Sequence, residues 1–341
     1  MSRLAALALA AALALGLVGC DTSSIVPGGS GDVMPNPAAS QTETTPSDGQ
    51  DAAFQMHFID VGQALSVLVE CDGQFMLYDG GNVDDGSLVV SYLQSQGVEQ
   101  LEYVVCSHAH EDHVGGLAAA LAYFPAYHVY SPVTEASTKC FKDFVKYTQQ
   151  QNLQVEVPVV GTQWALGSAT VTMLGPVAQD DAERDLVNSG ANLKVDVLQV
   201  GHHGSSTSTS YVFLNAVLPE MGIISCGVNN KYGHPHEETL SILRDAGVDV
   251  YRTDLLGTIT VSSDGQNYTV ATEHFATDAE LNPTDPAASS TAQQAYIGNV
   301  NSKKFHLPSC ANLPAEKNQI LFSSYDEAVA AGYSPCSSCI K

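Results

Sequence analysis

The chain has 341 residues, of which 44% are hydrophobic, and it carries a formal net charge of −24. This length allows one large domain or two ordinary ones, and the composition is typical of a globular protein, which excludes a chain that is disordered throughout. The strong acidity opposes non-specific binding to nucleic acid unless divalent cations screen or bridge the phosphates.

The first nineteen residues read as an apolar leader. Arg3 is the only charge, and Leu4 to Val18 consists almost entirely of Ala, Leu, Gly and Val before Gly19 and Cys20. A short apolar run that ends in a small residue before cysteine is typical of a bacterial lipoprotein signal, cleaved before the cysteine that then carries lipid. A transmembrane helix is the alternative, but it needs about 20 apolar residues. We therefore expect residues 1–19 to be a signal peptide outside the fold.

This interpretation predicts a lipid anchor on Cys20 that holds the protein at the extracytoplasmic face of the cell membrane. Residues 20–53 are rich in Ser, Thr, Pro, Gly and Asp, and they predict a flexible linker. No second window is apolar for long enough to span a bilayer, so we expect no membrane channel in this chain and no DNA transport by it alone.

An ordered domain is predicted from residue 54 to residue 275. Apolar runs predict strands at 54–59, 64–69, 75–78, 103–106, 155–160, 169–174, 195–200, 222–226 and 248–253, and short strands around Asp264-Gly265 within 258–270. Helical patterns fall at 87–96, 117–122, 139–151, 182–188, 210–218 and 237–245. Strands that alternate with helices in two successive halves predict an α/β fold with two sheets sandwiched between helices.

The rest of the chain forms a linker and a small module. Residues 276–295 are rich in Ala, Ser, Thr and Pro, and residues 296–341 read as a separate unit. Four lysines against three acidic residues (Glu316, Asp326 and Glu327) leave this unit with a charge of +1. It is therefore the least acidic part of the chain and the expected contact to DNA.

Four metal-binding side chains fall within six positions of the first half: His108, His110, Asp112 and His113. They directly follow the predicted strand 103–106 and lead through Gly115-Gly116 into a helix. A strand end turns side chains i and i+2 to one side, so all four can be aimed at one spot. Imidazole and carboxylate together suit Zn, Mn or Fe and are enough to begin two metal sites. A polar loop that holds three histidines by chance is the alternative.

Two more histidine-containing stretches follow in the second half. Gly201-His202-His203-Gly204 lies at the end of a predicted strand, and Ser205 and Ser206 come next. His234 lies in a loop between a strand and a helix. Exposed turn histidines are the alternative interpretation at both places.

The His108-x-His110-x-Asp112-His113 motif resembles the signature of the metallo-β-lactamase fold superfamily, a four-layer αββα sandwich. Five further stretches look like the extracellular hydrolase domain of the ComEC-type competence proteins. They are Phe58–Gln63, Tyr78–Asn82, Gly201–Ser205 with Ser208, Asn229–Pro235, and Tyr251–Asp254 with Gly257-Thr258. The resemblance covers about residues 54–270, and the order and spacing of its motifs make it specific.

The resemblance implies a phosphodiesterase or nuclease that acts on DNA or a related phosphoester with two divalent ions, Zn or Mn. One ion would be bound by His108 and His110, and the other by Asp112, His113 and one of His202 and His203. Two such ions lower the pKa of a bridging water and hold the phosphoester oxygens, and Asp112 is a catalytic candidate as their ligand.

Four further residues receive roles from the same resemblance. Asp79 would hold the metal histidines in the right tautomer. Ser205 and Ser206 would donate hydrogen bonds to phosphate, and His234 would protonate the leaving oxygen as a catalytic acid.

The chain departs from the family pattern after Leu174-Gly175-Pro176. The family has two more strands there, and the second ends in Thr-Gly-Asp, whose Asp bridges both metals. Here about twenty residues are absent, judged by the lengths that two strands need. Asp181 stands where the bridging Asp should be, and Asp180 replaces its Gly. Either Asp181 still reaches the metals from a shortened loop, or the site is impaired and one sheet lacks its middle.

The tail is similar to the zinc-binding domain of the Ada methyl-phosphotriester repair protein, which binds zinc with four cysteines. Here His306 stands in place of the first cysteine, and Cys310, Cys336 and Cys339 match the others. One histidine and three cysteines form a competent structural zinc set. Since the family's first cysteine is its methyl acceptor, His306 removes that chemistry. A disulfide between Cys336 and Cys339 is the alternative.

Four other cysteines, Cys71, Cys106, Cys140 and Cys226, show no spacing that defines a disulfide framework. In an exported protein they are either paired or buried thiols, and the sequence leaves both open.

Three functions fit these patterns. The first is a surface-anchored, metal-dependent phosphodiesterase or nuclease on extracellular nucleic acid. The second is a binding protein whose shortened core no longer hydrolyses and whose zinc module holds DNA or a partner. The third is a hydrolase of the same fold that acts on a lactone, a thioester or a cell-wall phosphodiester.

Overall fold

The computed structural model describes residues 6–9, 13–16, 54–175, 182–283, 296–306, 310, 313–315, 318–322 and 331–336. The chain divides into two compact units, residues 1–282 and 283–341, and each is described by itself. The predictions for Cys20, Asp181 and Cys339 lie outside the described residues. Within the described part of the chain, no helix has the length and the apolar composition that crossing a membrane requires.

The first sheet has eight strands in the order β15-β14-β3-β4-β5-β6-β7-β8. Their bounds are β3 (Phe54–Phe58), β4 (Val67–Cys71), β5 (Gln74–Tyr78), β6 (Leu101–Val105), β7 (Ala126–Tyr130), β8 (Val155–Glu156), β14 (Ile259–Ser263) and β15 (Tyr268–Thr272). Successive side chains of a strand point to opposite faces, so Val67 and Val69 enter the core between the sheets while Leu68 enters the core beneath the helices. The sheet is thus buried on both faces.

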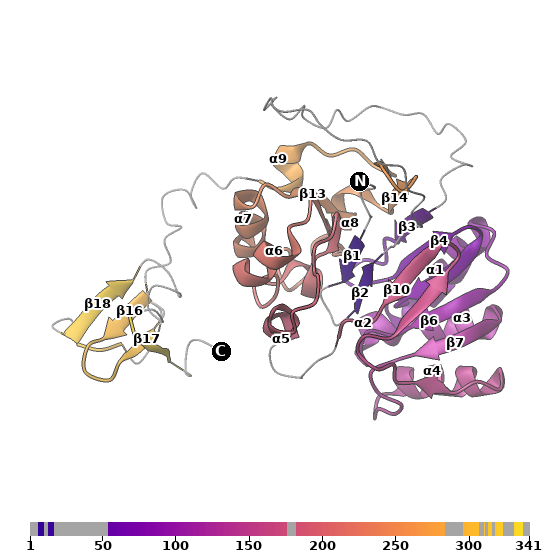
Figure 1. Cartoon of the computed structure of the whole chain (residues 1–341), viewed down its shortest axis with the longest axis horizontal. Helices are drawn as coiled ribbons and strands as arrows, with labels where there is room; N and C mark the ends of the chain where they lie inside the picture. The colour runs from indigo at the N-terminus through magenta and orange to yellow at the C-terminus, as the bar shows by residue number, and fades with distance from the viewer. Residues whose placement is uncertain are drawn as a thin grey trace, which may run out of the picture. The chain divides into compact units, whose positions relative to one another are not determined.

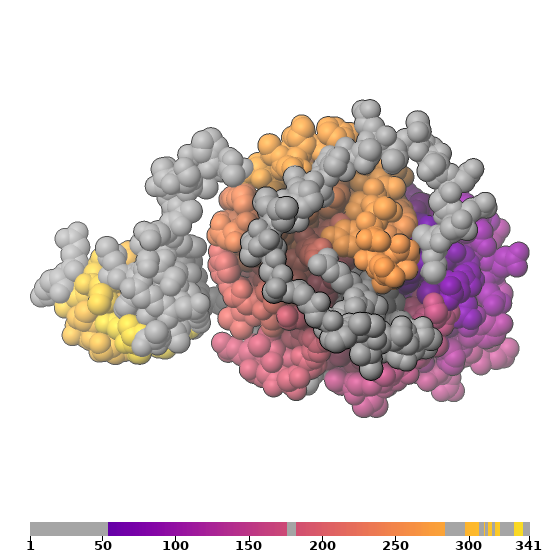
Figure 2. Space-filling view, turned by 45° about the horizontal axis from the view of Figure 1, so that its top comes forward, coloured from indigo at the N-terminus to yellow at the C-terminus, as the bar shows by residue number. Residues whose placement is uncertain are grey.

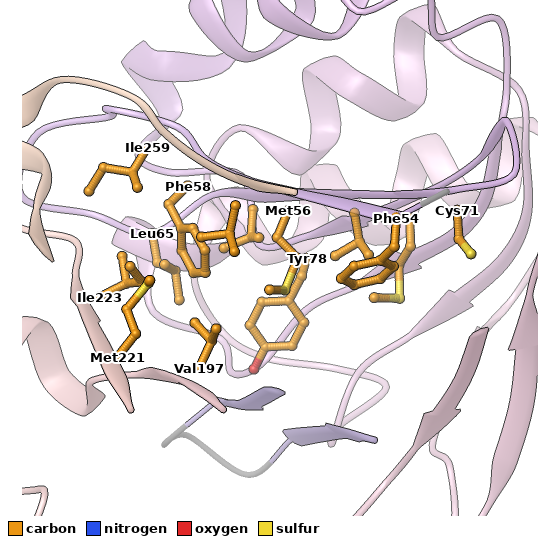
Figure 3. Close-up of a cluster of buried hydrophobic side chains, with 14 of the residues drawn as sticks. Phe54, Met56, Phe58, Leu65, Cys71, Tyr78, Val197, Met221, Ile223 and Ile259 are labelled. Carbon is orange, nitrogen blue, oxygen red and sulfur yellow. The ribbon is translucent and has the colours of Figure 1, made fainter. Parts of the chain in front are cut away.

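The second sheet has seven strands in the order β13-β12-β11-β1-β2-β10-β9. Their bounds are β1 (Ala6–Leu9), β2 (Leu13–Gly16), β9 (Gln163–Leu166), β10 (Ala169–Thr172), β11 (Val197–Gln199), β12 (Met221–Ile224) and β13 (Asp249–Arg252). The two sheets enclose one apolar core, in which Phe58 and Tyr78 of the first sheet face Val197, Met221 and Ile223 of the second (Figure 3).

Helices cover the outer face of each sheet (Figure 1). The first sheet is covered by α1 (Gly86–Ser95), α3 (Leu117–Tyr123) and α4 (Lys139–Gln150), and the second by α5 (Ala182–Asn188), α6 (Tyr211–Val217) and α7 (Glu237–Asp245). The α4 helix lies in the range 139–151 that the sequence predicts, and it buries Phe141, Phe144 and Thr148 on one face. The two halves of the sequence form different sides of the unit's surface, indigo to magenta and pink to orange (Figure 2). The four-layer αββα sandwich is confirmed.

Some element bounds differ from the predictions. The strand predicted at 155–160 ends at Glu156, because Pro158 has no N–H to donate to a neighbouring strand. The strand predicted at 64–69 begins only at Val67. The linker predicted from residue 276 contains the short helix α9 (Asp278–Leu281), whose capping box joins Thr277 and Glu280.

The second sheet has two positions between β11 and β10, and a hairpin from the predicted leader fills them. The β1 strand runs parallel to β11, with Leu7 opposite Val197, and β2 runs antiparallel to β10, with Ala14 opposite Thr172. Open edges of β10 and β11 would leave backbone N–H and C=O groups without partners in the middle of a sheet. The apolar leader has the composition that a central strand requires.

This arrangement differs from the prediction for the leader. The sequence predicts residues 1–19 outside the fold, whereas the structure places eight of them in β1 and β2. The described residues between β10 and α5 contain no strand, and β1 and β2 hold the two middle positions of the sheet. Cleavage before Cys20 would remove both replacement strands.

The second unit contains a four-stranded sheet in the order β18-β16-β17-β19. Its strands are β16 (Tyr296–Asn299), β17 (Lys304–His306), β18 (Gln319–Phe322) and β19 (Ser334–Pro335). Phe305 is fully buried, and Cys310 and Cys336 lie close to His306.

We predict that loss of residues 1–19 exposes the edges of β10 and β11. Full-length protein with Cys20→Ser, made without export, would be compared by hydrogen exchange with a chain that begins at residue 20. Peptides that contain residues 169–172 and 197–199 should exchange at least about tenfold faster in the shorter chain, since their ladder partners are gone. Peptides from β5 and β6 are the internal control. Equal exchange in both chains would contradict the role of the hairpin in the sheet.

Candidate metal centre

The predicted ligand loop follows β6 and leads into the short helix α2 (Glu111–Val114). The ring of His108 lies 4.7 Å from the ring of His110 and 4.0 Å from the ring of His113, measured between centroids. His113 is buried, His108 is half-buried and His110 is exposed. The structure therefore brings the three rings together at one place, as the spacing predicts.

Two glycines let this loop pack against the end of β5. A Cβ on Gly116 would lie 2.0 Å from the carbonyl oxygen of Gly80, and one on Gly115 would lie 2.3 Å from the backbone nitrogen of Val83. The backbone N–H of Gly80 donates to the carbonyl of His113 at 2.7 Å. Any larger residue at these positions would push the ligand loop away from Asp79.

Asp79 is fully buried and accepts three hydrogen bonds. They come from the backbone N–H of Ser107 at 2.7 Å, the Ser107 hydroxyl at 2.6 Å and Nδ1 of His113 at 2.7 Å. Burial by itself lowers the pKa of His113, but the Asp79 carboxylate outweighs it and the net pKa is raised. Because Asp79 occupies Nδ1, the free Nε2 of His113 faces Asp112 at 3.8 Å. This is the geometry in which a carboxylate orients a metal-binding histidine.

The second half contributes His203 to the same place. Its Nδ1 donates to the carbonyl of Ser225 at 2.8 Å, and its Nε2 lies 3.2 Å from Oδ2 of Asp112. Asp112, His113 and His203 each offer one ligand atom, and these atoms lie within 4.8 Å of one another. Burial alone would raise the pKa of Asp112, but the hydrogen bond and charges of His203 and His113 hold it well below its usual range.

His202 lies apart from this group. It is exposed, and its Nδ1 is 2.9 Å from the Thr207 hydroxyl. Both His202 and His203 adopt left-handed backbone conformations, with φ of 50° and 56°. Such strain in residues other than glycine is typical of functional turns, because the surrounding structure must hold it. Of the two candidates that the sequence leaves open, the structure places His203 at Asp112.

His234 lies beside this turn. A Cβ on Gly204 would lie 2.6 Å from the side chain of Pro235, so the glycine allows the two loops to touch. The ring of His234 is 5.7 Å from that of His202, and its Nδ1 is 3.1 Å from Nε2 of Gln63. Burial and the neighbouring histidines lower the pKa of His234 to about 4. At neutral pH it is therefore a neutral imidazole.

The two predicted phosphate donors differ in environment. Ser205 is buried and its hydroxyl lies 3.1 Å from that of Thr207. Ser206 is exposed, and its backbone N–H and hydroxyl each lie 3.1 Å from Nδ1 of His236. A phosphate would have to displace His236 to reach Ser206, whereas Ser205 supports the turn.

Sequence reasoning did not single out Ser107, Gln63 or Ser225 as functional residues. Ser107 joins Asp79 to His108 and His113, Gln63 joins Gly227 to His234, and the carbonyl of Ser225 orients His203. Ser107 directly precedes the ligand motif, and Gln63 ends the first ComEC-like stretch. Their position beside these motifs was the only feature of the sequence that could have indicated a role in the site.

The buried cysteines of the first unit are thiols. Cys71, Cys106, Cys140 and Cys226 are free, which resolves the open choice between pairing and burial for these four. Burial and the nearby Asp79 raise the pKa of Cys106 well above its usual range. Neither a disulfide nor a reactive thiolate is formed by Cys106.

In the second unit, His306, Cys310 and Cys336 are all buried and offer ligand atoms within 4.8 Å of one another. Nδ1 of His306 lies 3.4 Å from Sγ of Cys310. One imidazole and two thiolates in this arrangement suit zinc, and the predicted fourth ligand, Cys339, lies outside the described residues.

Comparison with known families agrees with both sites. Residues 59–217 match the family described as Metallo-beta-lactamase superfamily, and residues 284–341 match the family described as Metal binding domain of Ada. The chain therefore carries a metallo-beta-lactamase superfamily domain followed by an Ada zinc-binding domain, and both imply metal binding.

Several known proteins are similar to parts of the chain. Competence protein ComA of Neisseria gonorrhoeae is 33% identical over an alignment of 214 residues, and the match covers 59% of this chain and 31% of that protein. ComE operon protein 3 of Bacillus subtilis (strain 168) is 26% identical over an alignment of 251 residues, and the match covers 60% of this chain and 32% of that protein. The chain thus spans just under a third of the length of these relatives. A solved diphosphatase of the PhnP family is 16% identical and covers 58% of this chain and 94% of its own, with a TM-score of 0.34.

We predict that Asp79→Asn weakens metal binding at the first site about 10–100-fold, because His113 loses the carboxylate that orients it. Titration of metal-free protein with Mn²⁺ in a calorimeter measures this, since thiolate-rich sites such as the tail disfavour Mn²⁺. Asp84→Asn, an exposed change five residues away, is the matched control. Equal Mn²⁺ affinity in the two variants would show that Asp79 does not support the site.

A second prediction concerns the tail. Cys336→Ser should remove about one zinc ion per chain and unfold the second unit, because metal binding supplies most of the folding energy of such a module. Metal analysis and hydrogen exchange of residues 296–306 measure the two effects. Ser334→Ala, an exposed change two residues away, is the control. Retention of zinc by Cys336→Ser would contradict the assigned ligand set.

Proposed function

We propose that the protein is a metal-dependent phosphodiesterase or nuclease that acts on extracellular DNA or a related phosphoester. The observation that carries this proposal is the convergence of Asp112, His113 and His203 from both halves of the sandwich. His108 and His110 lie beside them. Curated relatives that share the domain bear competence-protein names, which supports DNA as the substrate.

Two divalent ions, Zn or Mn, would supply a bound water of lowered pKa and positive charge for the phosphate oxygens. His108 and His110 would hold one, and Asp112, His113 and His203 the other. Burial and the nearby His113 lower the pKa of His108 to about 4, so this ring is neutral at pH 7 and no proton must leave before metal binds. Asp112 is ionised at the same pH, as a ligand must be.

The surrounding residues would position the ligands and the substrate. Asp79 fixes His113, and the carbonyl of Ser225 fixes His203, so each ring presents its Nε2 to the site. We assign His234 as a hydrogen-bond donor to the phosphoester near the leaving oxygen. Its low pKa means that it acts as an acid only after taking up a proton in the complex with the substrate. Asp181 remains our candidate for the carboxylate that bridges the metals.

We place the protein at the outer face of the cell membrane, held by lipid on Cys20, with the zinc module as the contact to DNA. The net negative charge of the chain supports separate roles for the two units, because an acidic first unit needs its metal ions to bind the polyanion DNA. The small second unit carries less opposing charge.

A second candidate function is a DNA-binding or partner-binding protein that does not hydrolyse. The observation that favours it is that β1 and β2 hold the middle of the second sheet. The family pattern would place there the strand that presents the bridging carboxylate. In that case the first unit would hold fewer than two metal ions.

The proposed activity predicts a contrast between neighbouring histidines. His203→Ala should lower Mn²⁺-supported hydrolysis of a DNA oligonucleotide by at least about 100-fold, whereas His202→Ala, its exposed neighbour, should change it by less than about tenfold. Asp112→Asn and Asp181→Asn should each resemble His203→Ala. If wild type cleaves no phosphodiester with Mn²⁺, Zn²⁺ or Mg²⁺ and binds fewer than two ions outside the tail, the non-hydrolysing function is correct. An active Asp181→Asn would refute the bridging role alone.

The lipid anchor gives a separate prediction. Replacing Cys20 with Ser should move the exported protein from the membrane fraction to the soluble fraction or block its processing, because the thiol that carries the lipid is gone. Fractionation with detection of the tail measures this. Unchanged retention in the membrane would rule out lipidation at Cys20.

A further inference from the structure

The backbone of His234 is held by one side chain, that of Asn230. The Asn230 carboxamide accepts a hydrogen bond from the N–H of His234 at 3.0 Å and donates one to its carbonyl oxygen at 2.6 Å. The same amide nitrogen donates to the carbonyl oxygen of Gly227 at 3.0 Å. These bonds close the loop between Gly227 and His234 on itself, so the His234 ring extends from a fixed backbone position.

The ring itself is held by Gln63. The loop that carries Gln63 packs directly on Gly227, because a Cβ on this glycine would lie 2.6 Å from the backbone nitrogen of Gln63. The side-chain oxygen of Gln63 accepts a hydrogen bond from the N–H of Gly227 at 3.0 Å, and its amide nitrogen lies 3.1 Å from Nδ1 of His234. One carboxamide from the first half of the chain thus joins two residues of the second half.

These two contacts determine which nitrogen of the His234 ring carries a hydrogen. The backbone N–H of Gly227 can only donate, so the end of the Gln63 carboxamide that faces it must be the oxygen. The other end is then the NH₂ group, which also can only donate, so Nδ1 of His234 must accept. A neutral imidazole carries a single hydrogen, which therefore lies on Nε2.

The Nε2–H group points away from Gln63 and lies on a partly buried ring beside the metal centre. The centroid of the His234 ring is 5.7 Å from that of His202 and 6.5 Å from that of His203, the histidine that contacts Asp112. No residue in the described part of the chain accepts a hydrogen bond from Nε2. This donor is therefore available to a ligand.

We propose that Gln63 is a positioning residue that holds His234 as a neutral Nε2–H donor, and that this donor binds the phosphoester near its leaving oxygen without releasing the proton. The use of the donor rests on the proposed function. A neutral imidazole is too weak an acid to give up Nε2–H, but its hydrogen bond stabilises negative charge that develops on the oxygen. A second proton could enter at Nδ1 only if the Gln63 amide turned away and gave up its bond to Gly227.

Nitrogen NMR of full-length, ¹⁵N-labelled protein loaded with diamagnetic Zn²⁺ reports the tautomer, and His234→Ala identifies the signals of this ring. Spectra would be recorded at about pH 8.5, above the usual range of histidine pKa values. In wild type, Nε2 should carry the hydrogen, and a coupling across the hydrogen bond should join Nδ1 to the side-chain nitrogen of Gln63. In Gln63→Glu the hydrogen should move to Nδ1, because a carboxylate can only accept.

Asn229→Asp is the matched control, because it adds the same charge at an exposed position of the His234 loop. The φ of 52° at this position suits Asp as well as Asn. His234 should keep its wild-type tautomer in this variant. A hydrogen on Nδ1 in wild type overturns the role of Gln63, and so does an unchanged tautomer in Gln63→Glu. If Gln63→Glu does not fold, the wild-type coupling decides alone, and its absence overturns that role.

Hydrolysis tests the use of the donor. In Gln63→Glu, Nε2 becomes an acceptor and should no longer assist the departure of an alkoxide. The kcat for a thymidine dinucleotide should therefore fall at least about tenfold more than that for bis(p-nitrophenyl) phosphate, whose p-nitrophenolate leaves unaided. Both substrates are phosphodiesters with one negative charge, so the ratio of the two rates cancels repulsion by the new carboxylate. A merely structural defect would lower both rates equally.

Equal losses on the two substrates overturn the donor role and leave both the hydrolase proposal and the role of Gln63 in the tautomer intact. If wild type hydrolyses neither substrate, the hydrolase proposal fails and the donor role fails with it. The NMR result still decides the claim for Gln63 in that case, because it requires no turnover.

Discussion

The buried carboxylate of Asp79 is the interaction on which the first unit's site depends. A carboxylate removed from water must be satisfied by hydrogen bonds, and leaving one such bond unmade costs about 1–3 kcal/mol. Asp79 obtains its three from Ser107 and His113, which lie beyond the end of the neighbouring strand β6. The ligand loop is therefore tied to the end of β5 before any metal binds. Gly80 and Gly116 make this close approach sterically possible.

The position of the ligand loop also determines a contact with the second half of the sandwich, which is made by Asp112. Once His113 is fixed, Asp112 lies 3.2 Å from His203, and the core between the sheets holds the two halves at that separation. This contact lowers the pKa of Asp112, whereas burial alone would raise it. The packing of the two sheets therefore also determines how the metal ligands are placed.

The second sheet illustrates a conflict between two uses of one segment. An apolar run of Ala and Leu suits both a secretion signal and a central strand, since both environments exclude water. In the structure β1 and β2 occupy the positions between β11 and β10. Export with cleavage before Cys20 and completion of the sheet by these residues cannot both happen in one molecule. The shortened stretch between β10 and α5 is what creates this competition.

Sequence periodicity alone determined the αββα layers, most helices to within a residue or two, and the clustering of His108, His110 and His113, because these depend on local spacing. Tertiary structure decided what spacing cannot encode: that His203 rather than His202 meets Asp112, that Ser107 reaches Asp79 and Gln63 reaches His234, and that a distant leader fills the sheet. Those contacts join residues far apart in the chain, and only packing brings them together.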